Sequence, residues 1–238
     1  MKKEKVKKKQ SATRSIALGF ALIIFVGAIM LTLPIATRTG EVNFIASLFT
    51  ATSATCVTGL VVADTYQNWS VFGQIVVITM IQLGGLGFMT VGVYISVLLK
   101  KKIGLQERES IHESVNTLET AGVVRLVKKI VQGTFIIEGI GAMLLATRFI
   151  PRFGVKRGIY YSVFHSISAF CNAGFDLMGI EGEYSSLVAF EDDIVVNLVV
   201  MSLILIGGLG FIVWDDIQRN KWHFKKYLLH SPLQTILK

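Results

Sequence analysis

Long uncharged runs dominate the hydrophobic pattern of this chain. Residues 16–37, 67–99 and 194–214 contain no Asp, Glu, Lys or Arg, and a fourth apolar run, 130–147, is interrupted only by Glu138. A helix needs about 20 apolar residues to cross the hydrocarbon core of a bilayer. The mean hydropathy of +0.59 and the charged fraction of 17% agree with this pattern. The sequence therefore predicts an all-α integral membrane protein.

These runs predict four long helices, over residues 13–33, 71–99, 123–150 and 194–217. Prolines at 34 and 151 are expected to end the first and third of them. Two shorter helices, 44–54 and 158–169, are expected between the long ones, the first capped by Asn43. Eleven residues make only about 17 Å of helix, so each short helix should enter the membrane without crossing it.

A short sequence occurs twice, each time over the second half of a short helix and the turn that follows it. Residues 48–60 read LFTATSATCVTGL and residues 163–175 read VFHSISAFCNAGF, 115 positions later, with Ser, Cys and Gly in matching places. A second motif, GGLGF, occurs at 84–88 and again at 207–211. Recurrence of this kind indicates one structural unit used twice. We predict two parallel repeats of outer helix, re-entrant helix, turn and inner helix.

The resulting division of the chain has five parts. They are a basic cytoplasmic tail (1–12), a first pore unit (13–99), a cytoplasmic linker with a helix near 106–118 (100–121), a second pore unit (122–217) and a cytoplasmic segment that leads into a truncated third unit (218–238).

The net charge of +8 is distributed unevenly. Seven lysines and arginines precede the first apolar run, Arg38 alone lies between it and residue 70, and seven more lie between Lys100 and Lys129. Cytoplasmic segments carry the excess of Lys and Arg, so we predict a multi-pass plasma-membrane protein with a cytoplasmic N-terminus. The basic residues should meet anionic lipids and not nucleic acid. The first run is too long for a cleaved signal peptide and lacks a small-residue cleavage site.

The two turns are the candidate site. Irregular backbone at membrane depth is tolerated where it lines a watery cavity, and rings of carbonyl oxygens can replace the water around K+. Glycine at the end of each turn permits positive φ, which keeps successive carbonyls pointing the same way. The predicted ion-selectivity filter, which binds K+ through backbone carbonyls, consists of Thr55, Cys56, Val57, Thr58, Gly59, Phe170, Cys171, Asn172, Ala173 and Gly174. The competing interpretation is a pair of ordinary amphipathic loops.

With ATSATCVTGL and SAFCNAGF turns and a GGLGF motif in each unit, the whole chain resembles the Trk/Ktr/HKT superfamily, above all the membrane subunit of bacterial Ktr-type systems. The resemblance implies potassium uptake through a filter with one key glycine per unit, here Gly59 and Gly174. It also implies a homodimer that rests on cytosolic nucleotide-binding regulatory subunits. Some sodium-preferring members carry serine at the position of Gly59, so glycine there favours potassium over Na+.

The family builds each pore from four units and this chain contains two. We interpret the sequence as the N-terminal half of a longer transporter; two copies that pair to complete four units are the alternative. The rival functions are an assembly subunit of an ion-motive ATPase, a sodium-preferring transporter and a non-conducting structural repeat protein. No catalytic residue and no bound cofactor are expected, because the sequence offers no convergent acids, histidines or nucleotide motif.

Other polar residues have two interpretations each. Glu138 is a candidate intramembrane polar site, or it is hydrogen-bonded between helices. His165 is expected to be a packing histidine and GGLGF a site of close helix contact. Asp64 and the acids between 176 and 193 either concentrate cations at the pore mouth or lie in solvated loops. A disulfide between Cys56 and Cys171 is not expected, since both should line the site.

Overall fold

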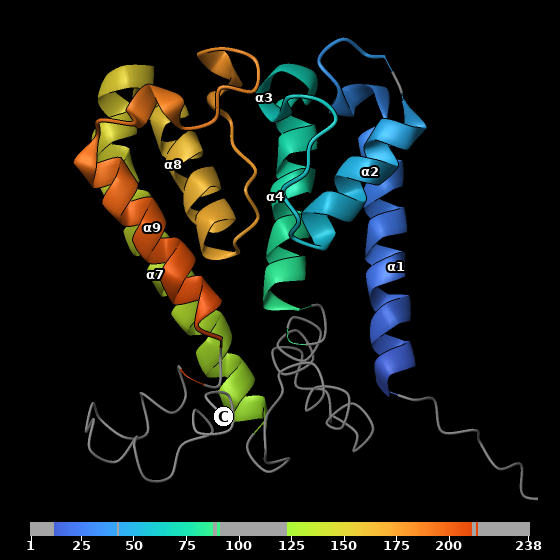
Figure 1. Cartoon of the computed structure of the whole chain (residues 1–238). Coiled ribbons are helices and arrows are strands. Elements are labelled where there is room, and N and C mark those ends of the chain that lie inside the picture. The colour runs from blue at the N-terminus through green and yellow to red at the C-terminus, as the bar shows by residue number, and fades with distance from the viewer. Residues whose placement is uncertain (1–11, 42, 88–89, 91–122, 211–212, 214–238) are drawn as a thin grey trace, which may run out of the picture.

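The computed structural model describes residues 12–41, 43–87, 90, 123–210 and 213. Two groups of helices lie side by side (Figure 1). The first group contains α1 (Ala12–Thr32), α2 (Phe44–Thr55), α3 (Thr65–Asn68) and α4 (Val71–Leu86). The second contains α7 (Val123–Phe153), α8 (Val155–Phe170) and α9 (Ile194–Gly208). Short 3₁₀ turns, Pro34–Ala36, Met178–Ile180 and Val188–Phe190, complete the described elements.

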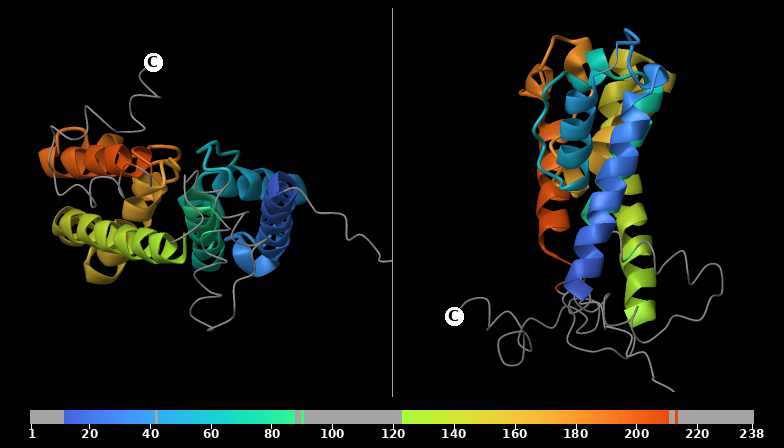
Figure 2. Two further views of the ribbon diagram at one scale, coloured as in Figure 1. Left: turned by 90° about the horizontal axis from the view of Figure 1, so that it is seen from below. Right: turned by 90° about the vertical axis from the view of Figure 1, so that its right-hand side faces the viewer.

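Each group has the same order of elements, a long helix, a short helix that packs on it, and a second long helix. In the first group α1 packs on α2 and α4, and in the second α7 packs on α8 and α9. A view from below the helices shows the two groups as separate clusters that meet along α4 and α8 (Figure 2). The described residues form helices without strands, so the predicted all-α fold is confirmed.

The beginning of α2 is confirmed as the sequence predicts. The side-chain oxygen of Asn43 accepts hydrogen bonds from the backbone N–H groups of Ile45 and Ala46, each at 3.1 Å. These N–H groups have no partner within the helix, and an Asn cap satisfies them. The helix has 12 residues, or about 18 Å.

Helix α7 corrects one prediction, because it does not end at Pro151. It runs on to Phe153 with Pro151 inside its last turn. Proline removes one backbone donor, that of its own N–H, and so close to the end a single missing bond does not stop the helix. The helix ends instead at Gly154, which has a φ of 80° and donates its N–H to the carbonyl of Ile150 at 2.9 Å.

The inner helices are the second correction. They were expected to continue to residues 99 and 217, but α4 ends at Leu86, inside the first GGLGF motif. Gly87 has a φ of 76°, which lies outside the helical region near −63°, and its N–H donates to the carbonyl of Gly84. Helix α9 ends at Gly208, two residues before Gly210 with a φ of 80°. Residues 88–89, 91–99, 211–212 and 214–217 lie outside the described part.

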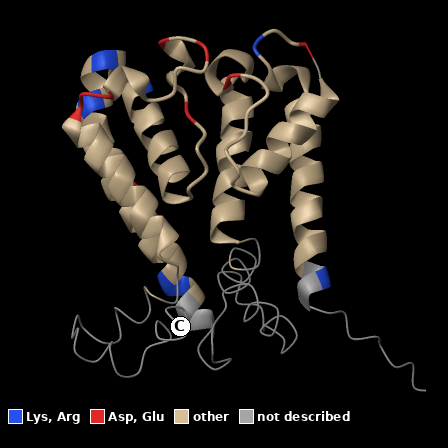
Figure 3. Cartoon of the chain, viewed as in Figure 1, with Lys and Arg blue, Asp and Glu red and all other residues tan. Residues whose placement is uncertain are grey.

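Charged side chains gather at the two ends of the helices (Figure 3). Between these ends the surface of the helices is largely apolar, with exposed residues such as Phe135, Ile136, Met143 and Leu205. One helix of the described part, over Val127–Phe153, is long and apolar enough to cross a membrane, and the apolar segments Ile16–Thr32, Val71–Leu86 and Ile194–Gly208 are shorter.

Several predictions fall on residues outside the described part. They are the basic tail up to residue 11, the linker 100–121 with its helix at 106–118, and the start of a third unit at 231–238. The division of the chain into five parts therefore stays a prediction.

Candidate functional site

The first turn follows directly on α2. Cys56 caps the helix by donating its N–H to the carbonyl of Thr52 at 2.8 Å. The N–H of Thr58 then reaches back to the carbonyl of Ser53 at 2.9 Å. Val57 and Gly59 both have positive φ, 56° and 73°, and Thr58 between them does not, so the sign of φ alternates as the chain leaves the helix.

The second turn follows α8 with the same backbone pattern. Cys171 donates to the carbonyl of Ile167 at 2.9 Å, and Ala173 donates to that of Ser168 at 2.8 Å. Asn172 and Gly174 have φ of 59° and 73°, within a few degrees of their counterparts in the first turn. The positive φ expected at Gly59 and Gly174 is confirmed.

Left-handed conformation at Val57 and Asn172 was not predicted from the sequence. Asn adopts it more readily than other non-glycine residues, whereas a β-branched residue such as Val is a true outlier there. The asparagine at position 172 could therefore have predicted a left-handed conformation, whereas the valine at position 57 could not.

The two turns approach each other at their glycines. A Cβ atom on Gly59 would lie 2.5 Å from the carbonyl oxygen of Ala173 and 3.4 Å from the Cα atom of Gly174. A Cβ atom on Gly174 would lie 3.5 Å from the Cα atom of Gly59. The structure therefore brings the C-terminal ends of both predicted filter segments together at one place.

The first glycine of each GGLGF motif lies against the end of a short helix. A Cβ atom on Gly84 would overlap the carbonyl oxygen of Thr55, and one on Gly207 would overlap the carbonyl oxygen of Phe170. Each inner helix thus touches the backbone where its turn begins. The expectation that GGLGF marks a close helix contact is confirmed.

A hydrogen bond that involves a buried serine side chain stabilises each turn. The hydroxyl of Ser168 donates to the carbonyl of Phe175 at 2.6 Å. In the first turn the hydroxyl of Thr58 donates to that of Ser53 at 2.9 Å. Both serines are buried, at 3% exposure, so these bonds are shielded from water.

His165 is a packing residue, as expected. Its side chain is buried, its Nδ1 lies 2.7 Å from the carbonyl of Tyr161, and its Nε2 accepts the N–H of Leu177 at 3.3 Å. The proton therefore sits on Nδ1. Within the described ranges, no group of three or more His, Cys, Asp or Glu residues could hold a metal ion.

Asp64 corrects the expectation of a solvated loop. It is only 6% exposed, and one carboxylate oxygen accepts the N–H of Gln67 at 2.8 Å at the start of α3. The other oxygen accepts the N–H of Tyr184, from the outer loop of the second group, at 2.8 Å. Asp64 is a structural link between the two groups, whereas the side chain of Glu191 is exposed.

Glu138 lies in the middle of α7 with 4% exposure, and its carboxylate accepts hydrogen bonds from Gln82 of α4. This confirms a hydrogen bond between helices. The cysteines Cys56 and Cys171 are both free, in agreement with the absence of an expected disulfide.

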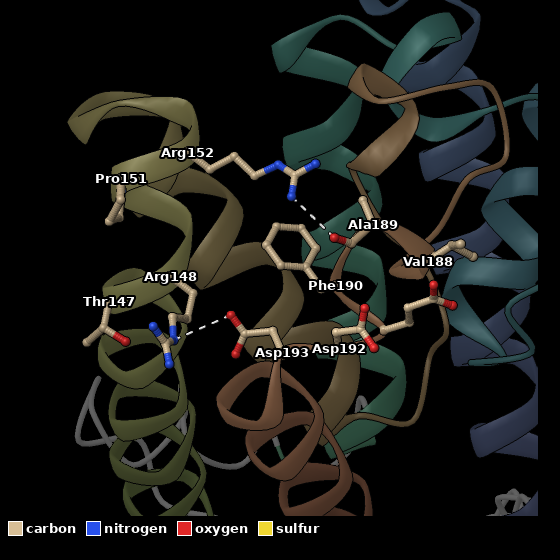
Figure 4. A pocket seen from close by; sticks show the side chains of 10 residues that line it. Thr147, Arg148, Pro151, Arg152, Val188, Ala189, Phe190, Asp192 and Asp193 are labelled. Atoms are coloured by element: carbon tan, nitrogen blue, oxygen red, sulfur yellow. Dashed lines mark hydrogen bonds and ion pairs between the residues drawn. The ribbon is translucent and has the colours of Figure 1, made fainter.

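A hollow of about 550 Å³ opens at the end of α7, away from the turns (Figure 4). Two ion pairs cross its rim, Arg148 to Asp193 at 3.4 Å and Arg152 to Glu181 at 2.9 Å. The guanidinium of Arg152 also lies 4.8 Å from the ring centre of Phe190. Both arginines that line this hollow therefore have acidic partners.

Comparison with known proteins gives consistent matches over nearly the whole chain. The profile of the TrkH family, described as "Cation transport protein", matches residues 3–231. The potassium/sodium uptake protein NtpJ of Enterococcus hirae is 45% identical over 97% of this chain. The Ktr system potassium uptake protein B is 45% identical in Bacillus subtilis, over 92% of the chain, and 37% identical in Vibrio alginolyticus, over 97%.

The chain spans about half the length of these relatives, 50%, 47% and 49% respectively. A membrane location follows from the family. On these matches, and on the resemblance of its motifs, the chain belongs to the TrkH family of cation transport proteins.

Proposed function

We propose that this chain supplies two of the units that surround a potassium pathway, and that the turns 55–59 and 170–174 form part of its selectivity filter. Helices α2 and α8 would enter the membrane without crossing it. Carbonyl oxygens of the two turns would replace water around a dehydrated K+ ion. The resulting activity is potassium uptake across the plasma membrane.

One observation carries this proposal, the matching backbone of the two turns. Positive φ at the third and last residue of each segment, 56° and 73° in one and 59° and 73° in the other, gives both turns the same path. Two segments that share only general hydrophobicity have no reason to share left-handed residues, of which one is a strained valine. Two segments that coordinate the same ion through the same backbone geometry do have such a reason.

The short helices support the same interpretation electrostatically. The C-terminal end of a helix carries about half a negative charge, and both α2 and α8 end directly at a turn. Two partial negative charges at one place favour a cation there. At membrane depth, a backbone carbonyl without a hydrogen-bond partner is costly unless it lines a water-filled cavity.

The names of the relatives agree on potassium and differ on sodium. The Bacillus and Vibrio proteins are named potassium uptake proteins, and the Enterococcus protein a potassium/sodium uptake protein. Sodium transport is therefore the second candidate function. Glycine at position 59, which leaves the carbonyl of Ala173 uncovered, favours potassium as the main ion.

Two units make half of the ring of four that the family resemblance implies. We propose that two further units, from the rest of the protein or from a second copy, complete the pathway. The word "system" in the names of the Ktr relatives supports a cytosolic partner, for which we propose a nucleotide-binding regulatory subunit. Membrane lipids and a second transporter subunit are the other proposed partners.

The test is potassium-limited growth of an uptake-deficient bacterium that expresses the intact protein, with ion uptake measured for K+ and Na+. Gly59→Ser should lower the K+/Na+ uptake ratio, because its side chain would meet the carbonyl of Ala173. Gly40→Ser is the matched control, since Gly40 has a φ of 74° but nothing within 4 Å of its Cβ position.

Equal uptake ratios in these two variants and the parent would contradict the proposed filter. Loss of complex formation with unchanged selectivity would instead indicate an assembly subunit of an ion-motive ATPase.

A further inference from the structure

A chain of three polar side chains connects the two helix groups directly behind the second turn. The side-chain nitrogen of Gln82, on α4, donates to both carboxylate oxygens of Glu138, on α7, at 3.0 and 3.2 Å. The side-chain oxygen of Gln82 lies 3.9 Å from the thiol of Cys171, which donates to it. Cys171 is the residue that caps α8 and begins the second turn.

The order of donors and acceptors in this chain is fixed by the carboxylate. Both side-chain oxygens of Glu138 accept from the nitrogen of Gln82, and an amide has one donating and one accepting end. Glu138 therefore orients the amide of Gln82 with its nitrogen toward α7. The oxygen of Gln82 is then the end that faces Cys171, where an acceptor suits a thiol.

Close packing holds the thiol in this position. A Cβ atom on Gly85 of α4 would lie 2.6 Å from the sulfur of Cys171, so the thiol lies against bare helix backbone. On the other side Ser166 of α8 donates its hydroxyl to the backbone carbonyl of Glu138 at 2.7 Å. Helices α4, α7 and α8 thus meet at the point where the turn starts.

Within the residues that the structure describes, Cys56 of the first turn is exposed, whereas Cys171 is half-buried against Gly85 of α4. The three-residue chain connects the second turn to the helix group of the first.

We infer that Gln82 and Glu138 are positioning residues that hold the second turn in register with the first, through the hydrogen bond that the thiol of Cys171 donates to the side-chain oxygen of Gln82. This inference rests on the proposed function, because the register of the two turns matters to the protein only if both contact the same ion. Neither side chain needs to touch the ion itself.

The first experiment measures the reaction of Cys171 with N-ethylmaleimide in the intact protein carrying Cys56→Ser. Gln82→Glu replaces the donating amide beside Glu138 by a second carboxyl group. We expect repulsion between the two to separate α4 from the second turn, so that Cys171 becomes accessible and reacts about tenfold faster; this gain in access has to outweigh the added negative charge, which disfavours the thiolate. Adding Glu138→Gln to that variant restores one donor and one carboxylate in exchanged places. The double variant should return to within about twofold of the parent rate.

Glu41→Gln, a charge removal at an exposed glutamate, is the control and should leave the rate unchanged. Should Gln82→Glu fail to fold, Gln82→Leu, which removes the acceptor for the thiol without adding a charge, replaces it in both measurements, with the same expected rise in the Cys171 rate. A double variant as reactive as Gln82→Glu alone, or identical rates in all variants, would overturn it.

The second measurement is the K+/Na+ uptake ratio of the same variants. A positioning role predicts a ratio lowered about tenfold in Gln82→Glu and recovered in the double variant. A merely structural role would lower the amount of protein in the membrane and leave the ratio unchanged, which would also overturn the inference.

The two measurements separate this inference from the proposed function. If the parent protein shows no Gly59-dependent potassium uptake while the Cys171 rates follow the expected order, the proposed function fails and the hydrogen-bonded chain stands. If uptake depends on Gly59 while Cys171 rates and uptake ratios are the same in all Gln82 and Glu138 variants, only the inference fails.

Discussion

The first and second turns have nearly the same backbone and are supported by different side chains. Their left-handed residues differ by no more than a few degrees in φ, yet Val57 occupies the place of Asn172. The buried serines also have different partners, the hydroxyl of Thr58 for Ser53 and the carbonyl of Phe175 for Ser168. The path of the chain is therefore the shared property, and each unit maintains it with its own contacts. Variants at matching positions of the two turns should show which effects come from the shared backbone path and which come from contacts that only one turn makes.

The largest effect is expected where each inner helix touches a turn. Gly207→Ala and Gly84→Ala each drive a methyl group into a backbone carbonyl, that of Phe170 or Thr55, which cannot rotate away. We expect a loss of about 3 kcal/mol in either unit, measured as a lower midpoint of thermal unfolding in detergent.

The neighbouring Gly208 provides the control for that pair. Its Cβ position has a nearest neighbour at 3.8 Å, the side-chain nitrogen of Asn172, and alanine favours a helix over glycine by about 1 kcal/mol. Gly208→Ala should therefore be neutral or stabilising. Equal destabilisation at 207 and 208 would show that the carbonyl contact is not the cause.

The next prediction is a difference in stability loss between alanine substitutions at the two filter glycines. Gly59→Ala and Gly174→Ala share the cost of a left-handed alanine, about 1 kcal/mol, because both have a φ of 73°. Only Gly59→Ala adds a contact of 2.5 Å with the carbonyl of Ala173; the nearest atom at Gly174 is 3.5 Å away. We expect Gly59→Ala to lower stability by about 2 kcal/mol more, again by thermal unfolding, with Gly40→Ala as the strain-only control.

A smaller effect is expected from exchanging the unlike residues of the turns. Asn172→Val places a β-branched residue at a φ of 59° and should cost about 1 kcal/mol. The reverse change, Val57→Asn, relieves a similar strain but removes apolar packing, because Val57 contacts the core, and should be near neutral. If Asn172→Val has no effect on the unfolding midpoint, the left-handed conformation there is not maintained in solution.

The smallest effect concerns the serines. Ser168→Ala leaves the carbonyl of Phe175 without its donor and should cost about 1 kcal/mol. Ser53→Ala should cost about half of that, because the hydroxyl of Thr58 can turn to the backbone carbonyl of Ser53, which lies 3.4 Å away. Thermal unfolding of the two single variants and of the double variant measures this difference.

The sequence predicted those features that depend on a local signal. Asn43 predicted the start of α2. The repeated glycines predicted the positive φ at 59 and 174 and the close helix contacts at 84 and 207. The failures came from positions where neighbouring structure decides. Pro151 did not end α7, since a single missing hydrogen bond near a helix end is tolerated, and Gly87 ended α4 inside a continuous apolar run.

The contacts between the two helix groups could not be predicted from the sequence, for a different reason. Gln82 was part of an unremarkable apolar run, and its bond to Glu138 connects residues 56 positions apart. Asp64 was grouped with surface acids because nothing nearby in the chain indicates its distant partner Tyr184. The partner of a polar side chain across an interface has no local signature.

The bond from Tyr184 to Asp64 also bears on how the two units have diverged. The second unit is eight residues longer than the first between its turn and its glycine motif, and Tyr184 lies in that longer loop. The longer loop of the second unit thus supplies a hydrogen-bond donor to the first unit. A chain built from two first units would lack this bond, so the two units are not interchangeable in the order in which they follow one another.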